Sequence, residues 1–330
     1  MGTVGIIANP LAGKDIRRLV ARAASVSDAD KISIVQRVAL GAVEGGATRL
    51  LVMPDGKHLA RRAIDPLDLA IPVETLDVAV TGYGVDSELA AEAMAKADVA
   101  AVVALGGDGT CRDIAKGWQD APLVALSTGT NNVFPLAIEA TTAGIAVGLV
   151  ASGRVAAAEV GERAKVIHTS VAGEEADLAL VDLVLLDGRF VGSRAVWNTD
   201  TLKAAVVAIA EPSAVGLSAI AAYSRRRSRR EPGGLALTFG PGGAVRRAPV
   251  APGMFADVSV ASIDDLDEGE SLRWIGPGVL TFDGERDRVV DDGQAIDIEI
   301  RRDGPCVIDV AAAVERGLGA GYADLGGGGS

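Results

Sequence analysis

The residues best suited to chemistry form one short run, Gly106-Gly107-Asp108-Gly109-Thr110, in which a single carboxylate stands among three glycines. Glycines let the backbone approach a phosphate closely, with N–H groups free to donate to it. The N-terminus of the helix expected after Thr110 adds a partial positive charge. A carboxylate in such an anion cradle is suited to take a proton from an attacking hydroxyl, or to help hold Mg²⁺ against a phosphate. The structural alternative is a tight strand-to-helix turn with Asp108 as the helix cap.

A second polar loop follows the next expected strand, from Ser127 to Asn132. Its side chains offer uncharged donors and acceptors, which suit ribose hydroxyls and a base edge. The alternative is a turn with an N-cap before Pro135. Asn9 follows the first strand and is placed either to bond a phosphate or ribose or to form an Asx turn. The candidate nucleotide-binding residues are Asn9, Gly106, Gly107, Gly109, Thr110, Thr128, Gly129, Thr130, Asn131 and Asn132.

These loops need strands that end at one edge of a sheet. The apolar run at 98–105 predicts a buried parallel strand, and strands alternate with helices throughout the first half of the chain. This alternation predicts a Rossmann-like, doubly wound and mainly parallel sheet with a crevice at the carboxyl ends of its strands. We expect strands at 3–8, 49–54, 71–80, 98–105 and 122–126, and helices at 15–24, 32–43, 57–64, 86–97, 111–117 and 135–150.

The composition changes after residue 153. Short β-like runs bounded by Gly, Pro and Asp predict a β-sandwich-like domain, interrupted by a helix at 201–210. A last amphipathic helix at 310–317 is able to return to the first domain. The expected division is an α/β nucleotide-binding domain at 1–153, a mostly β domain at 154–305, a C-terminal segment at 306–325 that packs back, and a linker scar at 326–330.

Composition excludes several classes of protein. The chain has 330 residues and a formal net charge of -12, which argues against a general nucleic-acid binder. Two cysteines and two histidines give neither a disulfide framework nor a zinc cluster, which fits a reduced, cytoplasmic compartment. The N-terminus lacks the basic region of a signal peptide, and the apolar stretch at 133–150 is interrupted by Pro135 and Glu139, which favours a buried helix over a membrane span.

The basic run from Arg225 to Arg230 and the residue Cys111 each have a structural and a functional interpretation. The basic run from Arg225 to Arg230 is interpreted first as a solvated loop and alternatively as a clamp for a phosphate-rich ligand. Cys111 begins the helix after the glycine-rich run, where a buried structural role is favoured over a redox role.

The glycine-rich run, the Ser127-Thr128-Gly129-Thr130-Asn131-Asn132 loop and Phe282-Asp283-Gly284-Glu285-Arg286 together resemble the NAD kinase/diacylglycerol kinase superfamily, in its ATP-NAD kinase-like branch. The resemblance covers most of the chain. It implies phosphoryl transfer from ATP or polyphosphate to a hydroxyl, with Mg²⁺ or another divalent cation. In NAD kinases the acceptor is the 2′-OH of NAD, and Asp108 would be the general base. In lipid kinases the base lies elsewhere, and Asp283, with Glu285 beside it, is the candidate.

The sequence departs from typical NAD kinases at two places. They carry Asn-Thr-Gly-x-Leu-Gly-Phe-Leu where this chain has the Thr-Gly-Thr-Asn-Asn loop, which is closer to lipid kinases. Their Asn-Glu or Asn-Asp pair is replaced by Val181-Asp182. A lipid or small-polyol kinase and a non-catalytic nucleotide sensor therefore stay as alternatives. We expect a small-molecule hydroxyl acceptor, no stable membrane association and a homo-oligomer, and the metal ligands are left unassigned.

Overall fold

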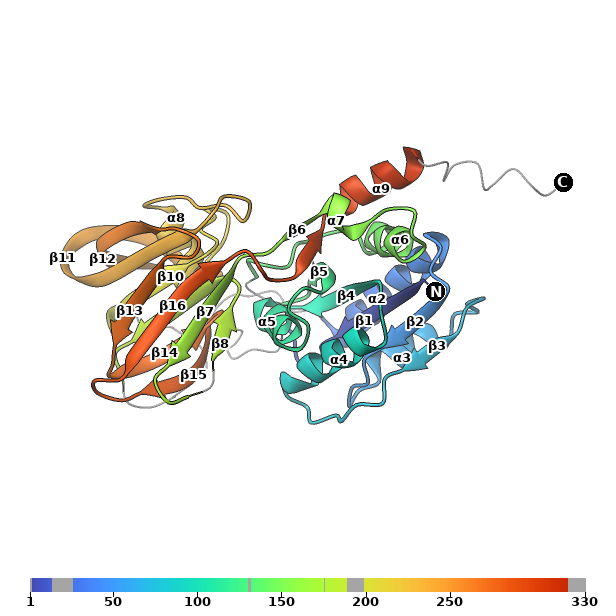
Figure 1. Cartoon of the computed structure of the whole chain (residues 1–330), viewed down its shortest axis with the longest axis horizontal. Helices are drawn as coiled ribbons and strands as arrows, with labels where there is room; N and C mark the ends of the chain where they lie inside the picture. Colours follow the sequence, from blue (N-terminus) through green and yellow to red (C-terminus); the bar gives the residue numbers. More distant parts are fainter. Residues whose placement is uncertain (1, 14–25, 130–131, 175, 189–198, 320–330) are drawn as a thin grey trace.

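The computed structural model describes residues 2–13, 26–129, 132–174, 176–188 and 199–319 of the chain. They form two domains that lie side by side (Figure 1). The first domain is built on a seven-stranded sheet covered by helices, and the second on a six-stranded and a four-stranded antiparallel sheet. The predicted fold class, an α/β half followed by a sandwich-like β half, is confirmed.

The sheet of the first domain has the strand order β3-β2-β1-β4-β5-β17-β6. All its strands run parallel except β6, which pairs antiparallel with β17. The chain moves outward from β1 through β2 to β3 and then returns to place β4 on the other side of β1. Such a switch point leaves a crevice at the carboxyl ends of β1 and β4. The strands are β1 (Thr3–Ala8), β2 (Arg49–Val52), β3 (Val73–Thr75), β4 (Ala101–Gly106), β5 (Pro122–Ser127), β6 (Gly161–Arg163) and β17 (Cys306–Ile308).

Helices cover both faces of this sheet because its central strands are apolar on both sides. Val102 and Ala104 of β4 belong to the core cluster that includes α4 and α5, whereas Val103 and Leu105 belong to the cluster that includes α2 and α6. The helices of this domain are α2 (Asp28–Glu44), α3 (Leu59–Ile64), α4 (Val85–Lys96), α5 (Asp108–Gly117), α6 (Ala140–Ala151), α7 (Ala157–Val160) and α9 (Val310–Gly319).

The second domain packs its two antiparallel sheets against each other. Ile167 and Ile298 of the four-stranded sheet share a core with Leu185 and Phe282 of the six-stranded sheet. The strand orders are β12-β11-β10-β9-β14-β15 and β13-β16-β7-β8, with the helix α8 (Leu217–Ala222) beside β11. The strands are β7 (Val166–Val171), β8 (Asp177–Ala179), β9 (Asp182–Leu186), β10 (Leu202–Val207), β11 (Gly234–Ala251), β12 (Met254–Leu266), β13 (Ser271–Ile275), β14 (Gly278–Phe282), β15 (Glu285–Val290) and β16 (Ala295–Arg301).

The chain crosses between the domains twice (Figure 1). It leaves the first domain through β6 and returns through β17, which inserts between β5 and β6. Val310 and Ala313 of α9 then join the apolar cluster of α6. Residues 306–319 therefore lie with the first domain, and residues 320–330 are outside the described part of the chain.

The helix predicted at 201–210 is wrong, because this segment forms β10 in the interior of the six-stranded sheet. Its run from Ala204 to Ala208 is buried throughout. A short, fully apolar run carries no periodicity that distinguishes a buried strand from a buried helix.

The helix predicted at 135–150 begins only at Ala140. Leu136 instead lies alongside β5, donating to the Ala125 carbonyl at 3.1 Å and accepting from the Ser127 N–H at 2.9 Å. Glu139 then caps α6 by accepting from the Thr142 N–H at 3.0 Å. The strand expected at 71–80 is reduced to β3, and the helix expected at 15–24 lies outside the described residues.

Candidate nucleotide-binding site

Asp108 is the first residue of α5, at the carboxyl end of β4. Its carboxylate accepts hydrogen bonds from the backbone N–H groups of Val133, at 3.0 and 3.1 Å, and of Phe134, at 2.8 Å. These donors belong to the polar loop that follows β5. The carboxylate therefore joins the two loops that the sequence predicts at one sheet edge, and the loop fixes its orientation.

The glycines around Asp108 leave room for their neighbours. A Cβ atom on Gly106 would lie 2.4 Å from the Cβ of Thr110, and one on Gly107 would lie 2.8 Å from Oδ1 of Asn132. Asn132 in turn donates to the Ser127 hydroxyl at 2.7 Å and packs against Gly129. Gly107 thus allows the close approach of a side chain from the other loop, whereas Gly106 and Gly129 leave room for side chains of their own loops.

Asn9 and Thr128 flank this turn from the neighbouring strands. Asn9 donates to the Thr110 hydroxyl at 2.9 Å and accepts from the Leu11 N–H at 2.8 Å, so it forms an Asx turn and also contacts the glycine-rich run. Thr128 is fully buried, and its hydroxyl has no hydrogen-bond partner among the described residues. The other two predicted residues of this loop, Thr130 and Asn131, lie outside the described residues.

Asp283 and Gly284 form the two-residue turn between β14 and β15, with φ values of +50° and +80°. An Asp-Gly pair favours this hairpin turn because both residues tolerate positive φ. The buried Asp283 carboxylate accepts from the N–H groups of Leu180, Val181 and Asp182 at 2.7 to 3.2 Å. Burial raises its pKa to about 6. Asp283 thus holds the backbone at the start of β9.

Glu285 differs from Asp283 because its side chain is exposed and lies beside the glycine-rich turn. A Cβ atom built on Gly109 would lie 3.3 Å from Oε1 of Glu285. The structure therefore brings one carboxylate of the Asp-Gly-Glu element to the Asp108 turn and directs the other into the β domain.

Two family models match the chain. The ATP-NAD kinase N-terminal domain matches residues 4–155, and the acetoin catabolism protein X C-terminal domain matches residues 165–303. Acetoin catabolism protein X of Cupriavidus necator is 40% identical over 328 residues, covering 94% of this chain and 91% of that protein. The chain belongs to the NAD kinase-like superfamily. The similarity to acetoin catabolism protein X extends over both domains of this chain.

A solved structure supports this fold. Yeast NADH kinase complexed with NADH superposes with a TM-score of 0.51 at 15% identity, covering all of this chain (100%) and 89% of that chain. A diacylglycerol kinase from Bacillus anthracis has a TM-score of 0.45 at 13% identity, covering 94% of this chain and 98% of that chain. The NAD kinase-like fold predicted from the motifs is confirmed.

Arg112 anchors α5 of this NAD kinase-like protein to its β domain. Its guanidinium donates to Asp177 at 2.7 Å and to the Leu178 carbonyl at 2.7 Å, and it lies 4.6 Å from the centre of the Phe282 ring. Both charged side chains are buried, at 6% and 7% exposure. Sequence reasoning missed this pair because no spacing links residues 65 positions apart.

Arg229 anchors the loop that holds Asp108. It donates to the carbonyls of Val133, at 2.8 Å, and Phe134, at 3.1 Å, the two residues whose N–H groups bind the Asp108 carboxylate. The basic run therefore contributes one side chain to the domain interface. The preferred interpretation of the whole run as a solvated loop is wrong for Arg229, whereas Arg225 and Arg226 are exposed as expected.

Asp113, one turn after Asp108 on α5, was also missed by sequence reasoning. Burial raises its pKa to about 7, and the neighbouring Glu285 carboxylate acts in the same direction against the opposing charge of Arg112. Cys111 is fully buried, which agrees with the structural role favoured from the sequence, and burial raises the pKa of its thiol.

The described residues contain no group of three or more His, Cys, Asp or Glu side chains arranged to hold a metal ion. Mg²⁺ is commonly held by one or two carboxylates together with substrate phosphates, and Glu285, whose exposed carboxylate lies beside Gly109, fits that pattern. Within the described part of the chain, no helix is long and apolar enough to cross a membrane.

Proposed function

We propose that this protein is a kinase that transfers a phosphoryl group from ATP to a hydroxyl, with the 2′-OH of NAD as the acceptor. The observation that carries the proposal is the fixed position of Asp108, between a glycine-rich turn and the loop after β5. Phosphoryl transfer depends mainly on positioning and charge neutralisation, and this geometry supplies positioning. Membership in the NAD kinase-like superfamily supports the reaction class.

Each part of the turn has a role in this proposal. The N–H groups of Gly107, Gly109 and Thr110 face the phosphates at the start of α5, whose partial positive charge favours anions. Asp108 takes the proton of the acceptor hydroxyl. A divalent cation, bound with the nucleotide, would offset phosphate charge next to Asp108 and Glu285. Thr128 is fully buried, so its hydroxyl is not exposed to a nucleotide and has no role in this proposal.

A lipid or small-polyol kinase is the second candidate, because the Thr-Gly-Thr-Asn-Asn loop departs from the NAD kinase pattern. In that case Glu285, which lies beside Gly109, is better placed than the buried Asp283 to act on an acceptor. A nucleotide sensor without turnover is the third candidate.

The test is a coupled assay of ADP release with ATP, Mg²⁺ and NAD, together with direct detection of NADP. We expect NADP with the wild type and a loss of about 10²–10⁴-fold in kcat for Asp108→Asn, which keeps one acceptor oxygen for the loop. Asp98→Asn, an exposed site with positive φ, is the matched control. Wild-type kcat in Asp108→Asn would exclude Asp108 as the base. ADP release only with another alcohol would reassign the acceptor, and nucleotide binding without ADP release for any acceptor would favour the sensor.

A further inference from the structure

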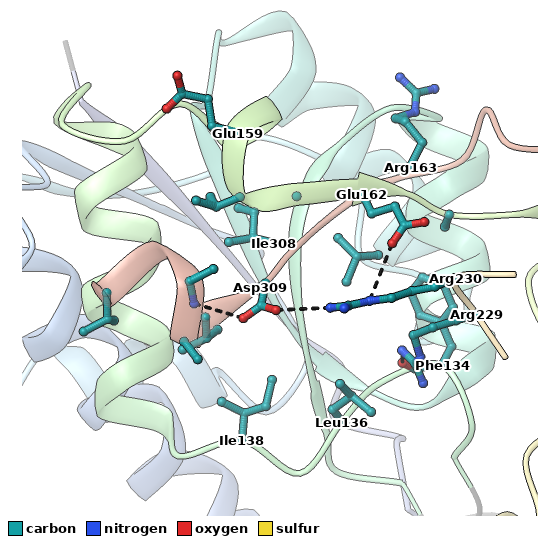
Figure 2. Close-up of a pocket in the computed structure, with 18 of the residues that line it drawn as sticks. Phe134, Leu136, Ile138, Glu159, Glu162, Arg163, Arg229, Arg230, Ile308 and Asp309 are labelled. Atoms are coloured by element: carbon teal, nitrogen blue, oxygen red, sulfur yellow. Dashed lines mark hydrogen bonds and ion pairs between the residues drawn. The ribbon is translucent and has the colours of Figure 1, made fainter. Parts of the chain in front are cut away.

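A cavity of about 860 Å³ lies between α6, α9, β6 and β17 of the first domain and the basic run of the second domain. Figure 2 shows side chains from β6, β17 and the basic run around one space. Ligand sites in proteins commonly have this size and occur at domain interfaces. The proposed kinase chemistry makes no use of this cavity.

The wall of the cavity is mainly apolar. Leu136, which is 43% exposed, lines the cavity together with other apolar side chains. An apolar wall of this extent selects a ligand with an aliphatic body. The side chains that form the wall include Phe134, Leu136, Ile138, Ile209, Ile308 and Val310.

Arg230 supplies a cation that can be redirected to a ligand. Its guanidinium lies between Asp309, at 3.3 Å, and Glu162, at 3.7 Å, and its side chain is 73% exposed (Figure 2). Contacts this long and this exposed contribute little free energy. Arg230 is therefore able to exchange them for the anionic group of a ligand.

The acidic residues around the cavity would keep partners after such an exchange. Glu162 is bonded to Arg302 at 2.9 Å, and Asp309 accepts from the Ala312 N–H at 3.0 Å as the cap of α9. Glu159 is paired with Arg316 at 3.1 Å, and Glu315 is exposed. If a ligand takes over the guanidinium of Arg230, Glu162 keeps its ion pair with Arg302, and Asp309 keeps its hydrogen bond from the Ala312 N–H.

We propose that this cavity binds a small organic anion with an aliphatic body, its carboxylate or phosphate on Arg230 and its chain against the apolar wall. The amine of Lys165 adds positive charge to the cavity, whereas the N-terminus of α9 is already capped by the Asp309 carboxylate. The site is separate from the nucleotide turn, because Phe134 stands between them.

Phe134 also connects the two sites. Its N–H donates to Asp108, its carbonyl accepts from Arg229, and its side chain lines the cavity. A ligand in the cavity therefore contacts the residue that orients the Asp108 carboxylate. Occupancy of the cavity changes the environment of the Val133 and Phe134 amides, which gives a local readout.

The test compares three probes with the same ten-carbon chain: decanoate, decanol and decylammonium. Binding to the full chain is measured by titration calorimetry below the micelle concentration of each probe, and amide resonances of Val133 and Phe134 are followed in parallel. The variants are Arg230→Ala, Ala312→Phe, which fills the cavity from α9, and Arg226→Ala as a control from the same basic run. None of these measurements needs kinase activity, so failure of the proposed function leaves the test intact.

We expect saturable binding of decanoate about tenfold tighter than of decanol or decylammonium, with shifts at both amides. Arg230→Ala should bring decanoate to the affinity of decanol, Ala312→Phe should abolish binding, and Arg226→Ala should leave binding unchanged. Absence of saturable binding, equal affinity for the three probes, or unchanged decanoate binding in Arg230→Ala or Ala312→Phe would overturn the proposal.

Discussion

Replacing Arg112 with Met separates α5, and with it Asp108, from the β domain. The change removes a 2.7 Å ion pair with Asp177, a 2.7 Å hydrogen bond to the Leu178 carbonyl and the contact with the Phe282 ring. Met replaces the aliphatic part of the side chain, so the loss is chiefly that of the guanidinium group with its charge and hydrogen bonds.

The magnitude follows from burial. Asp177 is 7% exposed, and without Arg112 its nearest described cation is Lys116 at 3.7 Å. Removing one member of a buried ion pair costs about 3–5 kcal/mol, because the other charge stays buried without its partner. Lys116 compensates in part, so we expect Arg112→Met to lower the free energy of unfolding by about 3 kcal/mol. Arg61→Met, in an exposed pair with Asp65, should cost less than about 1 kcal/mol.

A double-mutant cycle isolates the pair. Arg112→Met, Asp177→Leu and the double variant are unfolded in urea, and the free energies of unfolding are compared. The double variant should lose at least about 1.5 kcal/mol less than the sum of the two single losses, because neither charge is left alone. A coupling energy below about 0.5 kcal/mol would refute the view that this pair holds α5 on the β domain.

Three further perturbations test the positioning of the site. Arg229→Met should lower kcat at least about tenfold, because the loop that holds Asp108 loses two hydrogen-bond donors. Arg226→Ala, the control, should leave kcat unchanged. Equal kcat in the two variants would contradict a role of Arg229 in positioning this loop. Asp283→Ala should lower the free energy of unfolding by about 3 kcal/mol, because three buried N–H groups lose their acceptor, and Asp283→Asn should lower it less in urea unfolding; equal losses would contradict the acceptor role. The pKa of Asp113 is 3.8 in its ordinary state and about 7 in the native protein. Between pH 3.8 and pH 7 the native state therefore keeps a proton that the unfolded state has lost. The free energy of unfolding falls as pH rises through this window. The melting temperature should therefore fall less from pH 5 to pH 8 in Asp113→Asn than in the wild type, and an equal fall would contradict the raised pKa.

The motif residues and the parallel sheet were predictable from the sequence because each depends on local pattern. The apolar run of β4, followed by glycines, locates Asp108 at the end of a strand, and this prediction does not depend on contacts with distant segments. Asn9 and Thr128 follow from the same rule, since neighbouring parallel strands end at one edge. The structure agrees with this arrangement wherever it describes these residues.

What the sequence could not predict depends on contacts between distant segments. The ion pair of Arg112 with Asp177 and the contact of Arg229 with the Phe134 carbonyl join domains, and neither has a local pattern. Asp283 is the instructive case: its motif suggested chemistry, and the structure also places it in a hairpin turn, where it has positive φ and accepts from three backbone N–H groups. The same tripeptide, Asp-Gly-Glu, is typical both of a hairpin turn and of a catalytic motif, so the sequence alone does not distinguish them.

The insertion of β17 between β5 and β6 has a consequence for how the protein is made. Residues 306–308 are synthesised after the whole β domain, and until then β5 keeps an unpaired edge in the nascent first domain. The sheet of the first domain therefore cannot be completed before the β domain has been synthesised, because β17 follows that domain in the chain. A fragment ending after β6 would carry the same open edge, so the sheet beside the nucleotide turn is complete only when the segment that follows the β domain is present.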